Sequence, residues 1–278
     1  MNLGLISSAW LGSPVSHRDG IRKTKEIGFD TIDVFGDPME MDEGERRALR
    51  DACREAGLPV ISTLVCALGI ADFATVVRRF HIDRAKRVLD FGAELDSRNL
   101  LLVLGEYLWQ QEVITPADQW SWAVEGVREI AEHAAAMGRE IAIELEPFHL
   151  SMVNSVPKML RLLDDVGHPA VKANVDVSHL ALVHAAPAEI LQLRGRIAHV
   201  HLSDCDGKKH GDLPPGRGVV DFPPYLRALR EAGFEGTVSI ELEYSPEPEK
   251  IVEWVEEAYR ETDRLMRGAG VRGVTARA

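Results

Sequence analysis

Along this chain, segments typical of β-strands alternate eight times with segments typical of α-helices, and no other feature restricts the fold as strongly. Strands are expected at residues 3–7, 30–35, 58–65, 99–104, 140–146, 171–176, 197–202 and 237–242. Strands that alternate with helices pair in parallel, and eight such units close into a barrel of roughly 250 residues. We therefore predict an α/β fold, a single-domain (β/α)8 TIM barrel over residues 1–266, followed by a mobile C-terminal tail at residues 267–278.

The connections differ in length on the two sides of the predicted barrel. Helices pass into the next strand through short turns marked by Gly28, Gly57, Gly138 and Gly233, whereas the segments that leave the strands are long, at residues 105–116, 147–154 and 203–223. A TIM barrel carries its active site on the loops that follow its strands, so the long connections indicate the functional face. An open doubly wound sheet is the alternative, but it favours a glycine-rich phosphate loop after the first strand, where this chain has Ser-Ser-Ala-Trp.

Polar side chains mark the ends of the last four predicted strands, all on that functional face. Alternate residues of a barrel strand point inward. This alternation predicts that the inward positions are Glu144 and Glu146, Asn174 and Asp176, His199 and His201, and Glu241 and Glu243. One such residue alone is usually a helix cap or a hydrogen-bonded core residue. Four polar strand ends on one face indicate a shared site.

Buried carboxylates at this density repel one another and take up protons unless a cation neutralises them. Three carboxylates with one imidazole form a mostly oxygen site, which favours Mn²⁺ and also suits Mg²⁺, Co²⁺ or Zn²⁺. We therefore predict one divalent metal ion. Glu144, His199 and Glu243 are the weaker ligand candidates and are expected to orient the ligands instead.

The charge balance and the cysteines restrict the partners and the compartment. The formal net charge is −12, from 44 acidic residues against 32 Lys and Arg, which argues against binding nucleic acid. Three cysteines without paired spacing favour a reducing compartment. The first residues show no signal peptide, and no apolar run reaches the roughly 20 residues that span a bilayer. We expect a cytoplasmic protein without membrane contact that binds a small carbohydrate and forms a homo-oligomer.

Several short motifs together resemble the sugar phosphate isomerase/epimerase superfamily, the xylose-isomerase-like TIM barrels that include ketose 3-epimerases, hydroxypyruvate isomerase and inosose-processing enzymes. The motifs are Glu146-Pro147, Asp176-x-x-His179, His201-x-x-Asp204, Pro215-Gly216-Arg217-Gly218-x-x-Asp221-Phe222 and Ser239-Ile240-Glu241. The resemblance covers nearly the whole chain. It implies a metal ion held by Glu146, Asp176, His201 and Glu241, and a substrate contact from His179.

Two positions depart from the ketose 3-epimerase pattern. That pattern has a second Glu six residues after the first metal ligand, where this chain has Met152. It also has an Arg six residues after the metal histidine, where this chain has Gly207. The general chemistry is therefore expected to carry over better than the substrate.

The chemistry expected of such a site begins with removal of a proton next to a carbonyl that a metal ion polarises, giving a metal-stabilised enediolate. Glu146 and Glu241 flank the site and are the expected proton-transfer groups of an isomerase or epimerase acting on a keto sugar or sugar derivative. The same first step serves a metal-dependent lyase or dehydratase, including one that cleaves a C-linked sugar. An abasic-site endonuclease would need a basic DNA-binding face, and a non-catalytic barrel would not need two carboxylates placed for proton transfer.

Further substrate contacts are expected from the long loops. Lys208, Arg217 and the neighbouring His210 are candidates for binding a phosphate or carboxylate group. Trp109 is expected to stack on the substrate, with Tyr107 and Phe148 as similar candidates, while Trp10 and Phe35 fit pocket and packing roles equally well.

Overall fold

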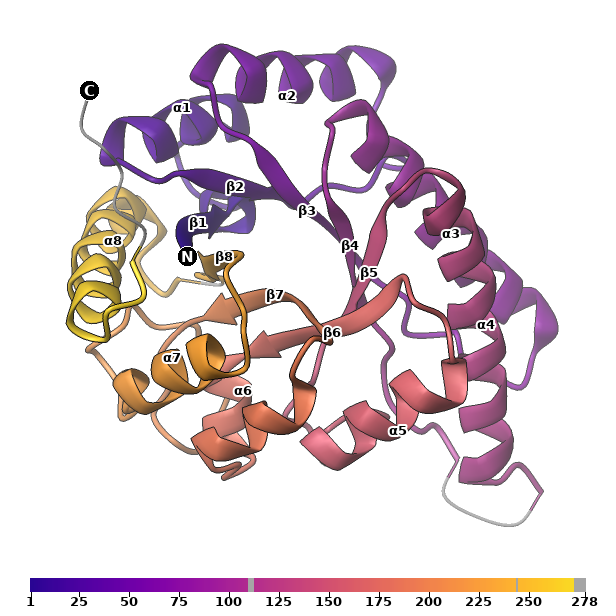
Figure 1. Ribbon diagram of the computed structural model, residues 1–278. Coiled ribbons are helices and arrows are strands. Elements are labelled where there is room, and N and C mark those ends of the chain that lie inside the picture. Colours follow the sequence, from indigo (N-terminus) through magenta and orange to yellow (C-terminus); the bar gives the residue numbers. More distant parts are fainter. Residues whose placement is uncertain (110–112, 244, 273–278) are drawn as a thin grey trace.

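Eight parallel strands form a closed barrel in the computed structural model, which describes residues 1–109, 113–243 and 245–272 (Figure 1). The strands are β1 (Asn2–Ile6), β2 (Thr31–Val34), β3 (Val60–Cys66), β4 (Asn99–Val103), β5 (Glu140–Ile143), β6 (Val171–Asp176), β7 (Ile197–Leu202) and β8 (Thr237–Ile240). Each strand pairs in parallel with the next, and β8 returns to pair with β1. The predicted TIM barrel is confirmed.

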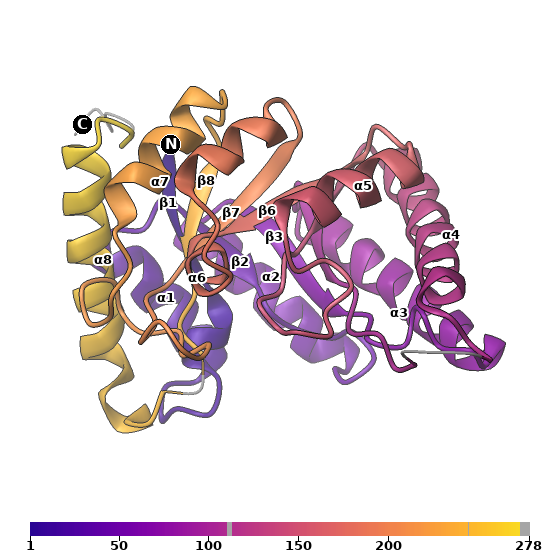
Figure 2. The same cartoon turned by 90° about the horizontal axis from the view of Figure 1, so that it is seen from below.

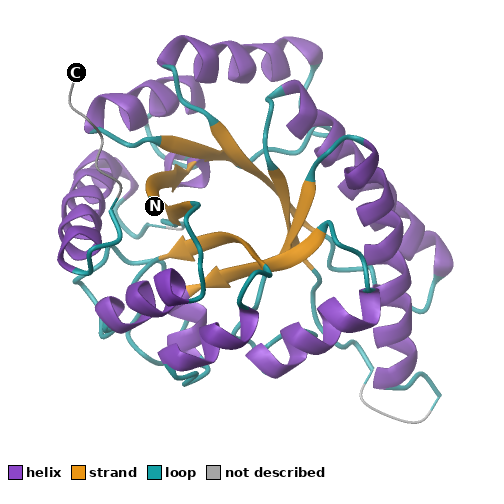
Figure 3. Cartoon of the chain, in the orientation of Figure 1, coloured by secondary structure: helices purple, strands orange, loops and turns teal. Residues whose placement is uncertain are grey.

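The helices form a ring outside the strands, as Figure 3 shows in purple around orange. They are α1 (His17–Ile27), α2 (Glu43–Ala56), α3 (Thr75–Glu94), α4 (Pro116–Ala136), α5 (Val156–Val166), α6 (Val177–Leu182), α7 (Phe222–Glu231) and α8 (Ile251–Gly268). Short 3-10 helices lie at η1 (Ser7–Trp10), η2 (Pro187–Leu193) and η3 (Pro248–Lys250). None of the described helices is long and apolar enough to cross a membrane.

Local sequence signals explain where several helices begin and end. Asp42 caps α2 by accepting from the Glu45 N–H, while the Glu45 carboxylate accepts from the Asp42 N–H. The same helix ends at Gly57, whose φ of 62° lies in the left-handed region that glycine adopts without a steric penalty. Such compact turns at the amino ends of the strands leave the opposite face to the longer loops.

The strand boundaries differ from the prediction where they bear on the site. Strands β5 and β8 end at Ile143 and Ile240, three and two residues earlier than expected, so Glu144 and Glu241 lie just beyond the strand ends. Helix α6 was not predicted. It begins directly after β6, where the side chain of Asp176 accepts a hydrogen bond from the His179 N–H as an N-cap.

The two ends of the described chain pack together on both sides of the predicted boundary at residue 266. Helix α8 continues to Gly268; it lies between α1 and α7 in the ring of Figure 1 and along the left edge of the molecule in Figure 2. Beyond it, the carbonyl of Val271 accepts from the amino terminus of Met1 at 2.8 Å, and Arg272 pairs with Asp30 and Asp263. The rest of the predicted tail, residues 273–278, lies outside the described residues.

Candidate metal centre and active site

Buried polar residues meet inside the barrel, at the carboxyl ends of the strands. His199 and His201 alternate along β7, and both side chains are completely buried. Asp176 is the last residue of β6 and stands opposite His201 in the register of the two strands. Asp176, His199 and His201 are all fully buried, as expected of side chains that point into the barrel.

His201 is the centre of the first cluster. Its Nδ1 lies 3.5 Å from Glu144 Oε1 and 3.4 Å from Glu241 Oε2. Ligand atoms of Glu144, Asp176 and His201 all lie within 4.8 Å of one another, a spacing that suits a shared metal ion. Asn174 donates a hydrogen bond to Glu144 and thereby holds this carboxylate inside the barrel.

Asp176 divides its two carboxylate oxygens between the fold and the site. Its Oδ1 accepts from the N–H of His179 at 2.7 Å and from the hydroxyl of Ser178 at 2.8 Å. Its Oδ2 is buried without a hydrogen-bond partner among the described residues, and both ring nitrogens of His201 share that state. A buried acceptor without a partner is costly. A divalent cation would satisfy these atoms, so the residues fit a metal ion.

The pKa values of the carboxylates in and beside the cluster also indicate that a bound cation would stabilise their ionised forms. Burial raises the pKa of Glu241 well above its ordinary value, although the nearby His201 lowers it. Burial likewise raises the pKa of Glu146, to about 7. For Asp176, burial acts in the same direction, but His179 and His201 bring its pKa below the ordinary value. A bound cation favours the ionised form of every carboxylate near it.

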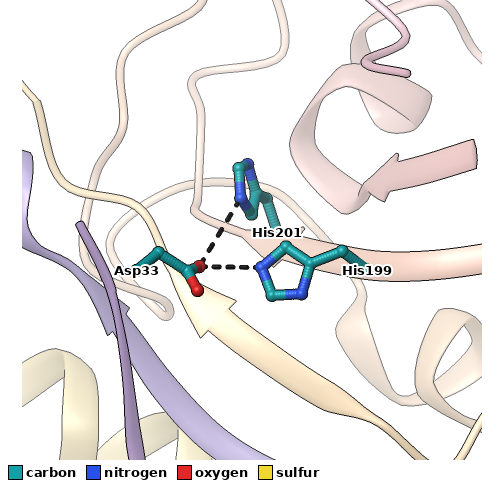
Figure 4. Close-up of side chains that lie close together, drawn as sticks. All are labelled: Asp33, His199 and His201. Atoms are coloured by element: carbon teal, nitrogen blue, oxygen red, sulfur yellow. Dashed lines mark hydrogen bonds and ion pairs between the residues drawn. The ribbon is translucent and has the colours of Figure 1, made fainter. Parts of the chain in front are cut away.

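A second cluster adjoins the first at His201, which belongs to both. Figure 4 shows its three side chains. Asp33 Oδ2, from β2, lies 2.7 Å from His199 Nε2 and 3.8 Å from His201 Nε2. The N–H of Ser62 donates to the other Asp33 oxygen at 3.1 Å. Ligand atoms of these three residues also fall within 4.8 Å of one another, but the 2.7 Å separation is that of a hydrogen-bonded pair.

Asp33 was not among the predicted site residues. The available signal was an aspartate inside the strand Thr31-Ile32-Asp33-Val34, all of whose residues are buried. With Asp33 on the Nε2 side of His201, the Nδ1 of that ring faces Glu144 and Glu241. This arrangement supports the predicted role of His199 and its surroundings in orienting a ligand.

The structure brings together three of the four predicted ligands and adds Glu144 as a third carboxylate. Asp176 and Glu241 each lie close to His201, and Glu144 lies near the same ring. Glu146 is half-buried and is not part of either metal-capable group. Among the charged groups around it, His179 has the largest effect on its pKa.

His179 is fixed beside the cluster by helix α6. Its Nδ1 lies 2.7 Å from the carbonyl oxygen of Leu145, which requires the hydrogen on Nδ1. Its Nε2 is buried and has no hydrogen-bond partner among the described residues. This nitrogen is therefore an acceptor available to a hydroxyl group, and the substrate contact of His179 stays a prediction.

The other predicted substrate-binding residues lie in three different settings. Trp109 is 47% exposed and its ring meets that of Phe73 edge to face, with centroids 6.0 Å apart. Lys208 is exposed in the loop between β7 and α7. Arg217 binds Glu257 through two hydrogen bonds of 2.6 and 2.8 Å and lies over the ring of Trp254, so α8 already occupies its guanidinium group.

A cavity of about 350 Å³ adjoins the strand ends next to Glu243. Phe35 contributes to its lining, and Ile251 is among the other apolar residues that surround it. Trp10 has a packing role, because only 1% of it is exposed and its indole N–H donates to Thr24 at 3.0 Å. Met152, at one of the two departures from the ketose 3-epimerase pattern, is a fully buried core residue.

Comparison with known proteins places this barrel in a family. The family model of xylose isomerase-like TIM barrels matches residues 21–262, so the chain belongs to that family. This result confirms the resemblance to sugar isomerases and epimerases that the motifs indicated.

Two curated relatives show the range of chemistry around this chain. Fructoselysine 3-epimerase of Escherichia coli O157:H7 is 23% identical over 256 residues, which cover 87% of this chain and 90% of the relative. The 3-dehydroshikimate dehydratase of Pseudomonas putida is 24% identical over 230 residues, covering 77% of this chain but 34% of that protein. The relatives are thus sugar epimerases, with a dehydratase also among them.

Solved structures confirm the fold over almost the whole chain. A D-allulose 3-epimerase from Methylomonas sp. has a TM-score of 0.82 at 18% identity, with 95% of this chain and 98% of that chain covered. The IolI protein, solved with a bound zinc atom, also has a TM-score of 0.82, at 19% identity, with 97% and 99% covered. At these identities the similarity shows the architecture alone.

Proposed function

We propose that this protein is a divalent-metal-dependent epimerase or isomerase of a keto sugar or sugar derivative. The observation that carries the proposal is the buried convergence of Asp176, His201, Glu241 and Glu144 at the carboxyl end of the barrel. Sugar epimerases among the relatives support the same reaction class.

Asp176, His201 and Glu241 would hold the metal ion, with Glu144 or Glu146 as the remaining carboxylate ligand. Oxygen donors with a single imidazole favour Mn²⁺, and they also suit Mg²⁺, Co²⁺ or Zn²⁺. When bound there, the cation polarises the substrate carbonyl and makes the adjacent C–H more acidic.

Glu146 and Glu241 are the proposed proton-transfer residues. Glu146 is half-buried beside the cluster, and its carboxylate would be ionised next to a cation and able to accept the proton that the cation makes more acidic. Glu241 follows β8 and Glu146 follows β5, so the two carboxylates approach a substrate from different sides of the barrel. His179 would accept a hydrogen bond from a substrate hydroxyl through Nε2 and hold the sugar between them.

Proton exchange tests this assignment most directly. Protein saturated with Mn²⁺ should incorporate solvent deuterium into a ketose such as D-allulose or L-ribulose, followed by NMR. We expect Glu146→Gln and Glu241→Gln to lower turnover by roughly 100-fold or more at saturating metal, because the amide cannot transfer the proton. Glu231→Gln, at an exposed position on α7, is the matched control. Full turnover in both site variants would refute the two-carboxylate mechanism.

A lyase or dehydratase acting on a sugar-derived substrate, including cleavage of a C-linked sugar, is the second candidate. The dehydratase among the relatives favours it, as do the departures at Met152 and Gly207. Both reactions begin with the same proton removal, so deuterium exchange without a new double bond or a released fragment distinguishes the epimerase.

The location and assembly of the protein extend the proposal. Cys53, Cys66 and Cys205 are free, which suits a reducing compartment such as the cytoplasm.

Val76 and Phe80 expose 76% and 49% of their surface on α3, and burying such side chains would favour a homo-oligomer. Sedimentation of the purified protein measures its oligomeric state.

A further inference from the structure

The long loop between β7 and α7 is fastened to the barrel by one buried carboxylate. Asp204 accepts hydrogen bonds from four backbone N–H groups, at distances between 2.8 and 3.1 Å. Its own backbone pairs in both directions with Leu213. Side chains in this loop are therefore held at defined positions over the carboxyl ends of the strands.

Asp212, in the same loop, is placed at an energetic cost. Its φ of 41° lies in the left-handed region, which non-glycine residues rarely adopt, and only 2% of it is exposed. Its Oδ1 accepts from the hydroxyl of Ser203 at 3.1 Å and lies 2.9 Å from His210 Nε2. A strained, buried carboxylate in contact with an imidazole is typical of functional sites.

His210 extends from this carboxylate toward the candidate site. Its ring centroid is 4.6 Å from that of His179 and 6.2 Å from that of Phe148. Burial alone would lower the pKa of His210, but Asp212, followed by the more distant Asp176 and Glu241, raises it to about 10. The contact with Asp212 thus favours the protonated, cationic form of the ring.

Building on the proposed function, we propose that His210 contacts the sugar beside His179 and donates a hydrogen bond from Nδ1 to a substrate oxygen. Asp212 is the positioning residue: its Oδ1 lies 2.9 Å from Nε2 as an ion-pair partner, without a directed hydrogen bond, and this leaves Nδ1 for the substrate. The cation would stabilise negative charge that develops on a substrate oxygen when a neighbouring proton is removed. It also supplies a positive charge in a loop where the expected Arg position is Gly207.

Four variants separate substrate contact from loop stability. His210→Gln removes the charge of the imidazole. Asp212→Asn replaces the orienting carboxylate with an amide, and Asn tolerates the left-handed conformation of this position. The double variant combines the two changes. Lys209→Ala, an exposed position in the same loop, is the matched control. The measurement is deuterium exchange into D-allulose and L-ribulose, with Mn²⁺-saturated protein and metal content determined for every variant.

We expect His210→Gln to lower kcat/KM by roughly 10- to 100-fold, as for a lost hydrogen bond to a charged group, with unchanged metal content. Asp212→Asn should lower it by less, and the double variant should be no worse than His210→Gln alone. Unchanged kcat/KM in His210→Gln overturns the substrate contact. Additive losses in the double variant would make Asp212 a purely structural residue.

A spectroscopic readout keeps this inference separate from the proposed function. In ¹⁵N-labelled protein loaded with Mg²⁺, the imidazole nitrogens of His210 should give the signal of a protonated ring at neutral pH, and this signal should shift toward that of the neutral ring in Asp212→Asn. If the wild-type protein exchanges no proton of any ketose, the proposed function is contradicted. If this signal is absent, the His210–Asp212 pair is overturned whether or not a ketose reacts.

Discussion

The two ring nitrogens of His201 illustrate how much depends on single atoms in this site. Nδ1 faces the carboxylates of Glu144 and Glu241, and Nε2 faces Asp33. A neutral imidazole carries its proton on one nitrogen only, so the carboxylate on the Nε2 side favours the form in which Nδ1 is free to bind a cation. Asp33 is in turn held by Ser62 and His199.

At the residue scale, we predict that Asp33→Asn weakens metal binding by about 10- to 100-fold, because an amide orients the two imidazoles less strongly than a carboxylate does. Isothermal titration with Mn²⁺ measures this change. Asp83→Asn, at an exposed position on α3, provides the control. An unchanged dissociation constant in Asp33→Asn would show that His201 needs no partner on its Nε2 side.

The candidate site combines residues of strands with residues of the segments that follow them: Asp176 and His201 lie on strands, whereas Glu144 and Glu241 lie just beyond strand ends. Helix α6 shows the coupling most clearly, since Asp176 both ends β6 and caps the helix that carries His179. In the next βα unit, Asp204 holds the loop that carries His210. Gly218 approaches Asp204 so closely that any side chain there would overlap the carbonyl oxygen of Cys205.

At the element scale, Asp204→Asn should loosen the loop between β7 and α7. In the wild type, backbone N–H groups donate to both carboxylate oxygens of Asp204, whereas the amide nitrogen of Asn carries hydrogens and cannot accept from them. We expect a loss of about 1–3 kcal/mol in local stability. Hydrogen–deuterium exchange should become faster in residues 213–220. The control is Asp206→Asn, whose exposed carboxylate accepts from two N–H groups of the same loop. Equal exchange in wild type and Asp204→Asn would mean that other contacts hold the loop.

Closure of the whole molecule depends on contacts between the first and last elements. Strand β8 pairs with β1, and the segment after α8 passes the amino terminus. The side chain of Arg272 is only 3% exposed. It bridges Asp30, which precedes β2, to Asp263 on α8. The barrel therefore gains support beyond strand pairing at the place where its two ends meet.

At the scale of the whole molecule, Arg272→Gln should lower the free energy of unfolding by about 1–3 kcal/mol, because two largely buried carboxylates lose their common cation. Urea denaturation measures the difference. Arg264→Gln removes an exposed pair with Glu261 on the same helix and should cost less than about 1 kcal/mol. Equal losses in the two variants would show that the junction of the chain ends contributes no special stability.

The sequence by itself determined the fold and the face that carries the site. Alternating strands and helices with short and long connections specify a barrel and its functional end, and the two-residue period of a strand specifies that His199, His201 and Asp176 point inward. These are local properties, set by hydrogen bonding and side-chain direction within each element.

Only the tertiary structure decided which of these groups meet. Glu144 and Glu146 have the same inward parity, and the choice between them depends on how β5 is staggered against its neighbours when the barrel closes. Asp33 is 166 residues from His199 in sequence, and Arg217 finds Glu257 across 40 residues. Such contacts arise from the packing of distant elements, because strand periodicity sets the direction of a side chain but not its partner on the opposite wall.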